Sequence, residues 1–176
     1  MIYRKPEATK ELYKVESYSS SIDKAEGFSE IWKIVKDSVK DFLGERRRGM
    51  MLFLDNLPPR VGAYHPLGTN NIVLNRTLVD TVESITKSKR LVNAFVYSLL
   101  VHEYLHALGH ITETEVRNLV YKISKECFGE DHIVTKLAET TPWILFKDIP
   151  LSNIKTSNSP MEIVKDFERP NGMYMV

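Results

Sequence analysis

Residues 91–108, LVNAFVYSLLVHEYLHAL, form the stretch of the sequence that decides the fold. Apolar residues occupy nearly every side of a helix drawn through this stretch, so we expect a helix over about 88–108 that lies buried in the core. Gly109 follows as the predicted end of that helix. The apolar run is interrupted near its end by His102, Glu103 and His106. Burying a carboxylate and two imidazoles without partners costs several kcal/mol, so some partner must compensate for them.

A divalent metal ion is one such partner, and the spacing of the histidines suits it. His102 and His106 are four residues apart, so both side chains leave the same face of a helix one turn apart. Two imidazole nitrogens can then reach one zinc ion at about 2.0–2.1 Å. Glu103 lies next to that face and can hydrogen-bond a water at the metal, which is the position of a general base. The pattern is His-Glu-x-x-His.

The segments before this helix predict a small sheet and two helices. Apolar spacing predicts a helix over 28–43, with Ser29 as its N-cap and Gly44 as its stop. Short apolar runs bounded by turn residues predict strands over 50–54, 61–65 and 72–74, and a helical segment over about 77–85 follows. Pro66 directly follows the second strand, which suits an edge position in the sheet.

The segments after the buried helix predict two more helices. Thr112 opens a helix that runs to about Phe128 and ends at Gly129, and a short helix over 131–138 ends before Pro142. The outer parts of the chain are polar. We expect an extended or loosely packed arm over 1–27, a folded domain over 28–146, and a surface tail over 147–176 that is long enough to cross a cleft.

The composition fits one domain with balanced charge. The chain has 176 residues, 24 Lys and Arg against 23 Asp and Glu, and a formal net charge of +1. This balance gives no long-range attraction to nucleic acid or an anionic membrane, and we interpret the basic run 46–48 as a solvated turn. No secretory signal and no membrane span of about 20 apolar residues is found. The one cysteine, Cys127, excludes an internal disulfide. We therefore expect a cytoplasmic protein without membrane or nucleic-acid partners.

HEYLH at 102–106, on a long apolar helix after a strand-loop-strand region, resembles the zincin metallopeptidases. The short chain is most similar to the minigluzincins, compact archaeal relatives of the gluzincins. Over residues 28–140 the resemblance implies an α+β fold. A small twisted mixed sheet would lie over the active-site helix, and a following glutamate helix would bring in the third zinc ligand. The resemblance also implies an edge strand, 61–65 or 72–74, that binds substrate backbone by strand addition.

The third zinc ligand stays open between three residues. A catalytic zinc site usually has three protein ligands and one water. Metzincins have a histidine three residues after the glycine that corresponds to Gly109, but Thr112 stands at that place. The gluzincin pattern needs a glutamate on the next helix, where we favour Glu115, although Thr112-x-x-Glu115 also forms a capping box. Glu113, in the first helical turn, and His110 are the alternatives.

Other polar residues are weaker candidates. Tyr64 and His65 lie beside the predicted edge strand and are candidates for contacts with substrate, and Arg117 and Asn118 can support the ligands from the glutamate helix. Surface or packing roles are the simpler interpretation for Tyr64, His65 and His132. Cys127 falls on an apolar stripe, which predicts an inert buried thiol.

The leading hypothesis for function is a zinc-dependent metallopeptidase with one Zn²⁺ ion and a peptide or protein substrate. Glu103 would act as the general base on the attacking water. One alternative is a non-catalytic zinc-binding or protein-interaction module on a zincin scaffold. Another is a latent enzyme whose tail, from about residue 147, blocks the cleft.

Overall fold

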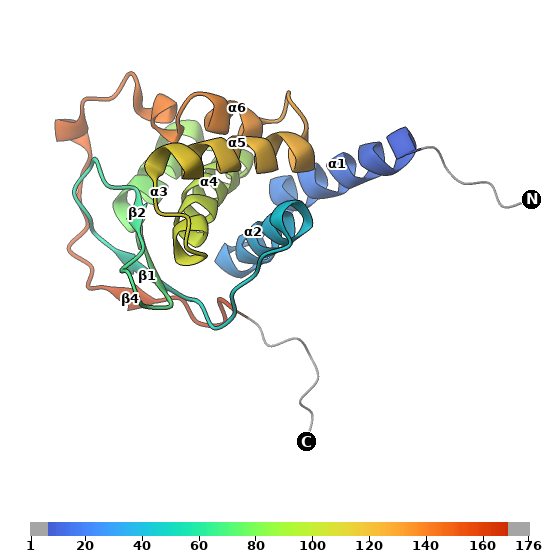
Figure 1. The fold of residues 1–176 in the computed structure, drawn as a ribbon. Coiled ribbons are helices and arrows are strands. Elements are labelled where there is room, and N and C mark those ends of the chain that lie inside the picture. Colours follow the sequence, from blue (N-terminus) through green and yellow to red (C-terminus); the bar gives the residue numbers. More distant parts are fainter. Residues whose placement is uncertain (1–6, 169–176) are drawn as a thin grey trace, which may run out of the picture.

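The computed structural model describes residues 7–168, which form six α-helices, two short 3-10 helices and one mixed four-stranded sheet (Figure 1). The predicted α+β class is therefore confirmed. The helices are α1 (Glu7–Lys24), α2 (Phe28–Leu43), α3 (Arg76–Thr86), α4 (Lys89–Ala107), α5 (Glu113–Phe128), α6 (Ile133–Glu139), η1 (Pro142–Phe146) and η2 (Leu151–Asn153). The strands are β1 (Met51–Asp55), β2 (Ala63–Tyr64), β3 (Asn71–Asn75) and β4 (Glu162–Ile163).

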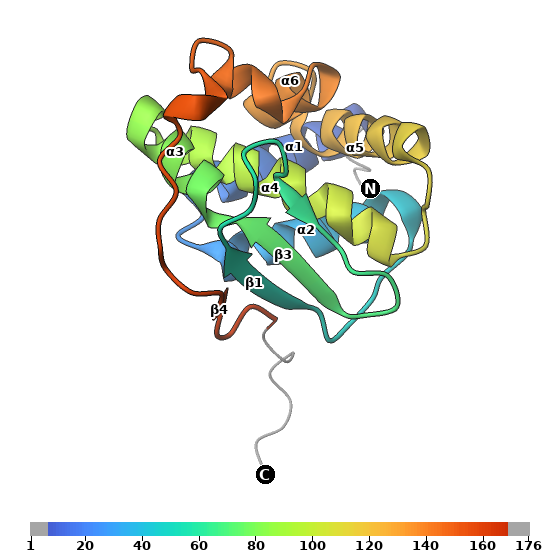
Figure 2. The ribbon, with the colours of Figure 1, turned by 90° about the vertical axis from the view of Figure 1, so that its left-hand side faces the viewer.

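Helix α4 is the centre of the molecule, as its apolar sequence predicts. It contacts the other five α-helices as well as β2 and β3. Figure 2 shows the sheet in front of α4, with α1 and α2 on the far side of that helix. The side chains of Tyr97, Leu100 and Tyr104 are completely buried. Ser88 caps the helix by accepting a hydrogen bond from the Leu91 backbone N–H.

The sheet has the order β2-β3-β1-β4, which leaves β2 at one edge as Pro66 suggested. β1 and β3 are parallel, and β2 runs antiparallel to β3. Leu52, Ile72 and Leu74 on the inner face are fully buried. Because α4 contacts both β2 and β3, the free edge of the sheet lies directly over this helix.

The expected arm over 1–27 is wrong for residues 7–24, which form helix α1 and pack against α2, α4 and α5. Val15, Tyr18 and Ile22 recur at helical spacing, and Ile22 is 1% exposed. The side-chain amide of Asn93, on α4, donates to the carbonyl oxygen of Ile22 at 2.9 Å. This stripe makes α1 part of the core, and residues 1–6 lie outside the described part.

The tail, as far as it is described, lies along the β1 edge and away from the edge formed by β2. Strand β4 pairs antiparallel with β1, and the Val164 backbone N–H donates to the carbonyl oxygen of Leu52 at 2.9 Å. Phe167 is buried and stacks on Trp32 with ring centroids 4.7 Å apart. The predicted surface tail is therefore an edge strand and a core contact over these residues.

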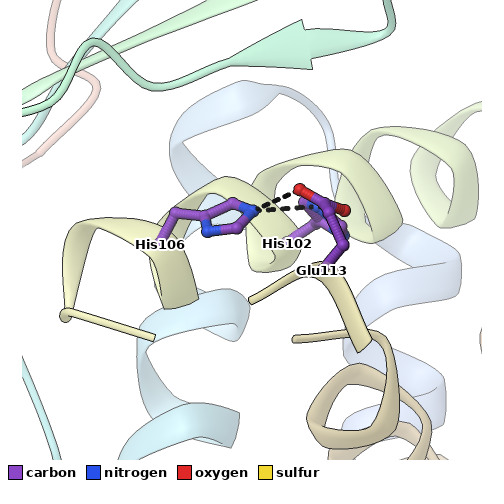
Figure 3. A group of neighbouring side chains, drawn as sticks. All are labelled: His102, His106 and Glu113. Carbon is purple, nitrogen blue, oxygen red and sulfur yellow. Dashed lines mark hydrogen bonds and ion pairs between the residues drawn. The ribbon is translucent and has the colours of Figure 1, made fainter. Parts of the chain in front are cut away.

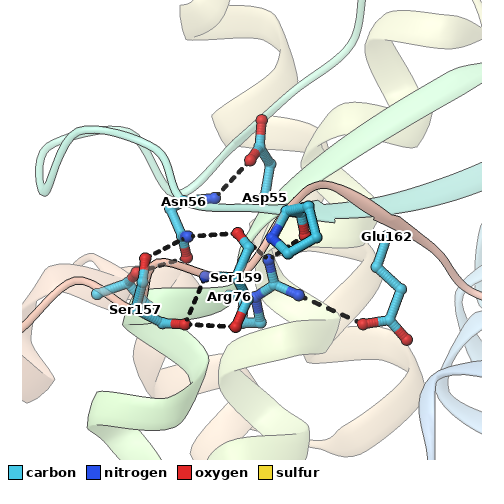
Figure 4. A network of polar contacts seen from close by, with 8 residues as sticks. Asp55, Asn56, Arg76, Ser157, Ser159 and Glu162 are labelled. Carbon is cyan, nitrogen blue, oxygen red and sulfur yellow. Dashed lines mark hydrogen bonds and ion pairs between the residues drawn. The ribbon is translucent and has the colours of Figure 1, made fainter.

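A polar network fixes this course of the tail (Figure 4). The Asn56 side-chain amide donates to the carbonyl oxygens of Ser157 and Ser159. The Arg76 guanidinium donates to the Pro160 carbonyl oxygen at 2.7 Å and pairs with Glu162 at 3.3 Å. The network holds the tail beside α3 and β1.

Most helix boundaries follow the sequence signals, with one exception at α2. Gly27, and not Ser29, is the N-cap of α2, while Gly44 ends this helix with φ 72 in the left-handed region. Gly129 follows α5 as predicted. No helix in the described part of the chain is long and apolar enough to cross a membrane.

Candidate metal centre

The last two turns of α4 and the first turn of α5 bring three side chains together (Figure 3). The Nε2 atoms of His102 and His106 are 3.2 Å apart. The Glu113 carboxylate spans both, with 3.2 Å from Oε2 to His102 Nε2 and 3.0 Å from Oε1 to His106 Nε2. The predicted pair of histidines is therefore completed by Glu113, which the sequence offered as an alternative.

Gly109 allows the chain to turn back onto His106. Its φ of 105 lies in the left-handed region, and the next backbone N–H, that of His110, donates to the carbonyl oxygen of Leu105 at 3.1 Å. The returning carbonyl oxygen of His110 accepts a hydrogen bond from His106 Nδ1 at 2.8 Å. Because this bond uses the Nδ1 proton, Nε2 of the neutral ring carries a lone pair that faces His102 and Glu113.

These donor atoms fit a zinc ion. Ligands at about 2.0–2.1 Å in a tetrahedron lie about 3.3–3.4 Å from each other. The two Nε2 atoms lie 3.2 Å apart, and each lies 3.0–3.2 Å from a different oxygen of the Glu113 carboxylate, close to that separation. Two histidines and one glutamate also form the ligand set of catalytic zinc sites that keep a fourth position open for water.

Burial lowers the pKa of His102, and the positive charge of Arg117, as well as that of a protonated His106, acts in the same direction. The Glu113 carboxylate opposes this effect. The neutral imidazole is the form that binds a metal ion, so the environment of His102 favours the ligand form. The side chains of His102 and His106 are 23% and 15% exposed, whereas that of Glu113 is 60% exposed, which places the cluster at the protein surface.

Glu103 lies beside the cluster on the inner side of α4. It is 9% exposed, and burial, together with the negative charge of Glu113, raises its pKa to about 8. A hydrogen bond from the His65 backbone N–H acts in the opposite direction. A cation held by the neighbouring histidines would favour the ionised carboxylate, since opposite charges stabilise each other.

Glu115, the favoured third ligand, points to a different partner. Thr112 caps α5 by accepting from the Glu115 backbone N–H, as the sequence predicts. The Glu115 carboxylate lies 2.9 Å from His110 Nδ1, and Glu45 lies 3.2 Å from Nε2 of the same ring. His110 is therefore held between two carboxylates, and its side chain belongs to this separate cluster.

A cleft of about 670 Å³ opens next to His102, Glu103 and Glu113. Its walls are residues 60–63 before and within β2, one face of α4, the outer face of α5, and the segment from α6 to η1. Arg117 and Asn118, the predicted supporting residues, both line it. Within the described residues, none of 147–168 lines this cleft, so the tail does not cross it there, and residues 169–176 lie outside the description.

The two weaker candidates for substrate contact lie outside the cleft. Tyr64 pairs with Val73, which in turn pairs with Phe53, so its side chain points to the outer face of the sheet. His65 Nδ1 donates to the Asn71 carbonyl oxygen at 2.8 Å, and its contact with Glu103 is made by the backbone. Neither side chain is among the residues that line the cleft.

Two residues that hold the elements around the site together, Arg47 and Asn75, were not indicated by any sequence motif. Arg47, within the basic run, donates to the carbonyl oxygens of Ala107 and Thr69 and so joins the end of α4 to the β2–β3 turn. The buried Asn75 side chain donates to three carbonyl oxygens in the loop before β2 and accepts from the Leu57 backbone N–H. The solvated turn expected for 46–48 is therefore wrong for Arg47.

No family model matches the chain, and neither the curated proteins nor the solved structures contain a significant match to it.

Proposed function

We propose that this chain is a zinc-dependent metallopeptidase. The observation that carries the proposal is the convergence of donor atoms from His102, His106 and Glu113 within 4.8 Å of one another, at a cleft that Glu103 also lines. Two imidazoles and a carboxylate brought this close together suit a zinc ion. The motif HEYLH and its resemblance to zincins give the same interpretation.

The division of roles follows from these positions. His102, His106 and Glu113 hold the ion, which when bound supplies a positive charge that acidifies water and polarises a peptide carbonyl. Glu103 accepts the proton of the attacking water and then delivers it to the leaving amine nitrogen, so that the carboxylate is regenerated. Its hydrogen bond from the His65 backbone N–H holds it on the cleft side of α4.

The substrate would lie along the free edge of β2, as an extended segment antiparallel or parallel to that strand. Ala63 of β2 lines the cleft, and among residues 7–168 the sheet continues from β2 on the other side, toward β3. The backbone groups at this edge can therefore pair with a peptide backbone above the metal ligands. Binding through backbone groups tolerates many sequences, which suits a peptidase.

The experiment that tests the proposal combines metal analysis with hydrolysis of a mixture of peptides. We expect one zinc per chain and hydrolysis that a chelator abolishes and added zinc restores. Glu103→Gln should retain zinc and reduce hydrolysis by about 10³-fold or more, because it removes the general base. A purified protein that neither contains nor binds zinc would refute the proposal. Zinc binding without hydrolysis would instead support the non-catalytic zinc-binding alternative.

The third ligand has a matched pair of variants on the same helical turn. Glu113→Gln should weaken zinc binding by more than about 100-fold, the upper end of what loss of an outer contact costs. Glu115→Gln makes the same chemical change two residues away, next to His110, and should leave zinc affinity within a few-fold of the parent protein. The opposite result would assign the ligand to Glu115.

A further inference from the structure

The cleft carries two arginines that have no acidic partner. Arg60, in the loop before β2, and Arg117, on α5, both line it. Within residues 7–168 neither guanidinium group forms an ion pair, in contrast to Arg76, which pairs with Glu162 at 3.3 Å. Both side chains are exposed to solvent. They are therefore available to a ligand that enters the cleft.

The two arginines reach the cleft from different walls. Arg117 lies four residues after Glu113 on α5, so its side chain leaves the same face of the helix as the proposed metal ligand. Arg60 comes from the loop that leads into β2. This loop lies close against α4, because a Cβ atom on Gly62 would be only 2.7 Å from Leu99 Cδ2. A group bound between the arginines would therefore lie within the cleft and near the metal ligands.

The acidic residues of the cleft are already engaged. Glu113 contacts both histidines, and Glu103 accepts a hydrogen bond from a backbone N–H. Glu139 lies 3.7 Å from Lys136. Arg60 and Arg117 lie next to apolar side chains of the lining that include Leu99, Val120, Leu137 and Trp143. A carboxylate on a ligand would therefore meet two guanidinium groups that form no ion pair within the described residues.

We propose that the cleft selects peptides that carry a carboxylate close to the scissile bond, and that Arg117 and Arg60 bind this carboxylate. The inference rests on the proposed peptidase function and names its substrate class. A guanidinium group binds a carboxylate through two parallel hydrogen bonds, which fix the position of the carboxylate as well as attract it. The carboxylate is that of an acidic side chain or that of a free C-terminus, since both present the same two oxygens.

The test uses one peptide scaffold with matched changes at the residues that flank the scissile bond. Three peptides with amidated C-termini carry Ala, Asp or Lys there, and a fourth carries Ala followed at once by a free C-terminal carboxylate. We expect kcat/KM of the zinc-loaded protein to be about tenfold higher for a carboxylate peptide than for the amidated Ala peptide, a typical gain for one charge-assisted hydrogen bond. The better of the Asp and free-terminus peptides identifies the source of the carboxylate.

Variants at Arg117 distinguish a preference for carboxylate peptides from a general effect on catalysis. Arg117→Gln should abolish the preference, and Arg117→Glu should reverse it in favour of the Lys peptide. Arg48→Gln is the matched control, because Arg48 is an exposed arginine that does not line the cleft. This control should leave the ratio between the peptides unchanged. Equal rates on all four peptides, or an equal loss with every peptide in Arg117→Gln, would overturn the inference.

Equilibrium binding keeps this test separate from the test of peptidase activity. The same four peptides are titrated into zinc-loaded Glu103→Gln protein, where binding does not require turnover. Tighter binding of a carboxylate peptide, lost in the Glu103→Gln, Arg117→Gln double variant, supports the inference even if no peptide is hydrolysed. If peptides are hydrolysed but none binds better for its carboxylate, the selection is refuted and the peptidase function stands.

Discussion

His106 and His132 are both imidazoles in largely buried positions with a carboxylate oxygen within 3.0 Å, yet their surroundings differ in one respect. Nε2 of His132 lies 2.9 Å from Asp23 Oδ1, and its Nδ1 accepts from the Val134 backbone N–H at 3.2 Å. A single neutral tautomer, with the proton on Nε2, satisfies both contacts. The ring also stacks on Phe128. Both ring nitrogens of His132 thus have a hydrogen-bond partner, and no metal ion is needed to satisfy them.

The two ring nitrogens of His106 cannot both be satisfied in this way. Its Nδ1 proton is used by the His110 carbonyl oxygen, so its Nε2 lone pair faces another Nε2 and a carboxylate. A proton on His102 Nε2 can be donated to only one of its two neighbours, so without a cation His106 Nε2 and the Glu113 oxygen 3.0 Å away still face each other as two acceptors. A histidine beside a carboxylate is therefore not in itself a sign of a metal site. The informative feature is the convergence of several acceptors that one tautomer cannot satisfy.

Among the expected differences between the surroundings of His106 and those of His132, the largest should be the effect of zinc on folding stability. A ligand that binds only the folded state stabilises it by about 4.1 kcal/mol at a thousand times its Kd. We expect this gain in folding stability in the parent protein and in His132→Asn, where it is measured as a rise in Tm on adding zinc. It should be absent in His106→Ala. A zinc-dependent shift that survives in His106→Ala but not in His132→Asn would break the comparison.

The next effect concerns the affinity for zinc itself. His106→Ala should weaken zinc binding by more than about 100-fold, because it removes a direct ligand rather than an outer contact. Competition with a chromophoric chelator measures this value. His132→Asn serves as the control, since His132 is the N-cap of α6 and follows the end of α5 opposite to Glu113, and the zinc affinity of this variant should equal that of the parent.

The sequence predicted the part of the site that lies on one helix. His102, Glu103 and His106 follow from the helical period alone, because α4 sets their relative positions. The glutamate that joins the two histidines depends on how α5 is rotated relative to α4, which in turn depends on the turn at Gly109. Thr112 was correctly predicted as the N-cap, but the cap does not say which glutamate of the first turn faces α4. The sequence therefore favoured Glu115, while the geometry brings Glu113 to the histidines.

The errors in the fold predicted from the sequence have a similar cause. Helix α1 shows only a thin apolar stripe, and the serines at 17 and 19–21 dilute its pattern, so the segment resembled an arm. Strand β4 has two residues, both exposed, and is defined by its partner β1 rather than by its own sequence. Local patterns predicted elements with strong periodicity. Elements whose stability comes from tertiary contacts were missed.

The pH dependence of stability should report on His132. Burial lowers the pKa of His132 below its usual 6.5, although Asp23 opposes this shift. The unfolded chain therefore binds a proton more readily, and stability is lost as pH falls through and below about 6.5. Urea unfolding of zinc-free protein at pH 7, 6 and 5 should show a steeper loss in the parent than in His132→Asn. His102, His106 and Glu113 are unchanged between the two proteins, so the difference between the two curves isolates His132. Parallel curves would contradict this assignment.

The smallest effect should come from removing the carboxylate beside His132, in contrast to removing the one beside His106. Asp23→Asn keeps an oxygen that accepts from Nε2, and it removes a charge that is about one third exposed and also pairs with Arg90 at 3.1 Å. Such partly exposed pairs contribute about 0–1 kcal/mol, so thermal unfolding of the zinc-free protein should change by that amount or less. Asp23→Asn should not change the affinity for zinc. Glu113→Gln makes the equivalent carboxylate-to-amide change at the cluster and should weaken zinc binding strongly. If Asp23→Asn weakened zinc binding as strongly as Glu113→Gln, the two carboxylates would be equivalent, and convergence would not distinguish a metal centre from a structural ion pair.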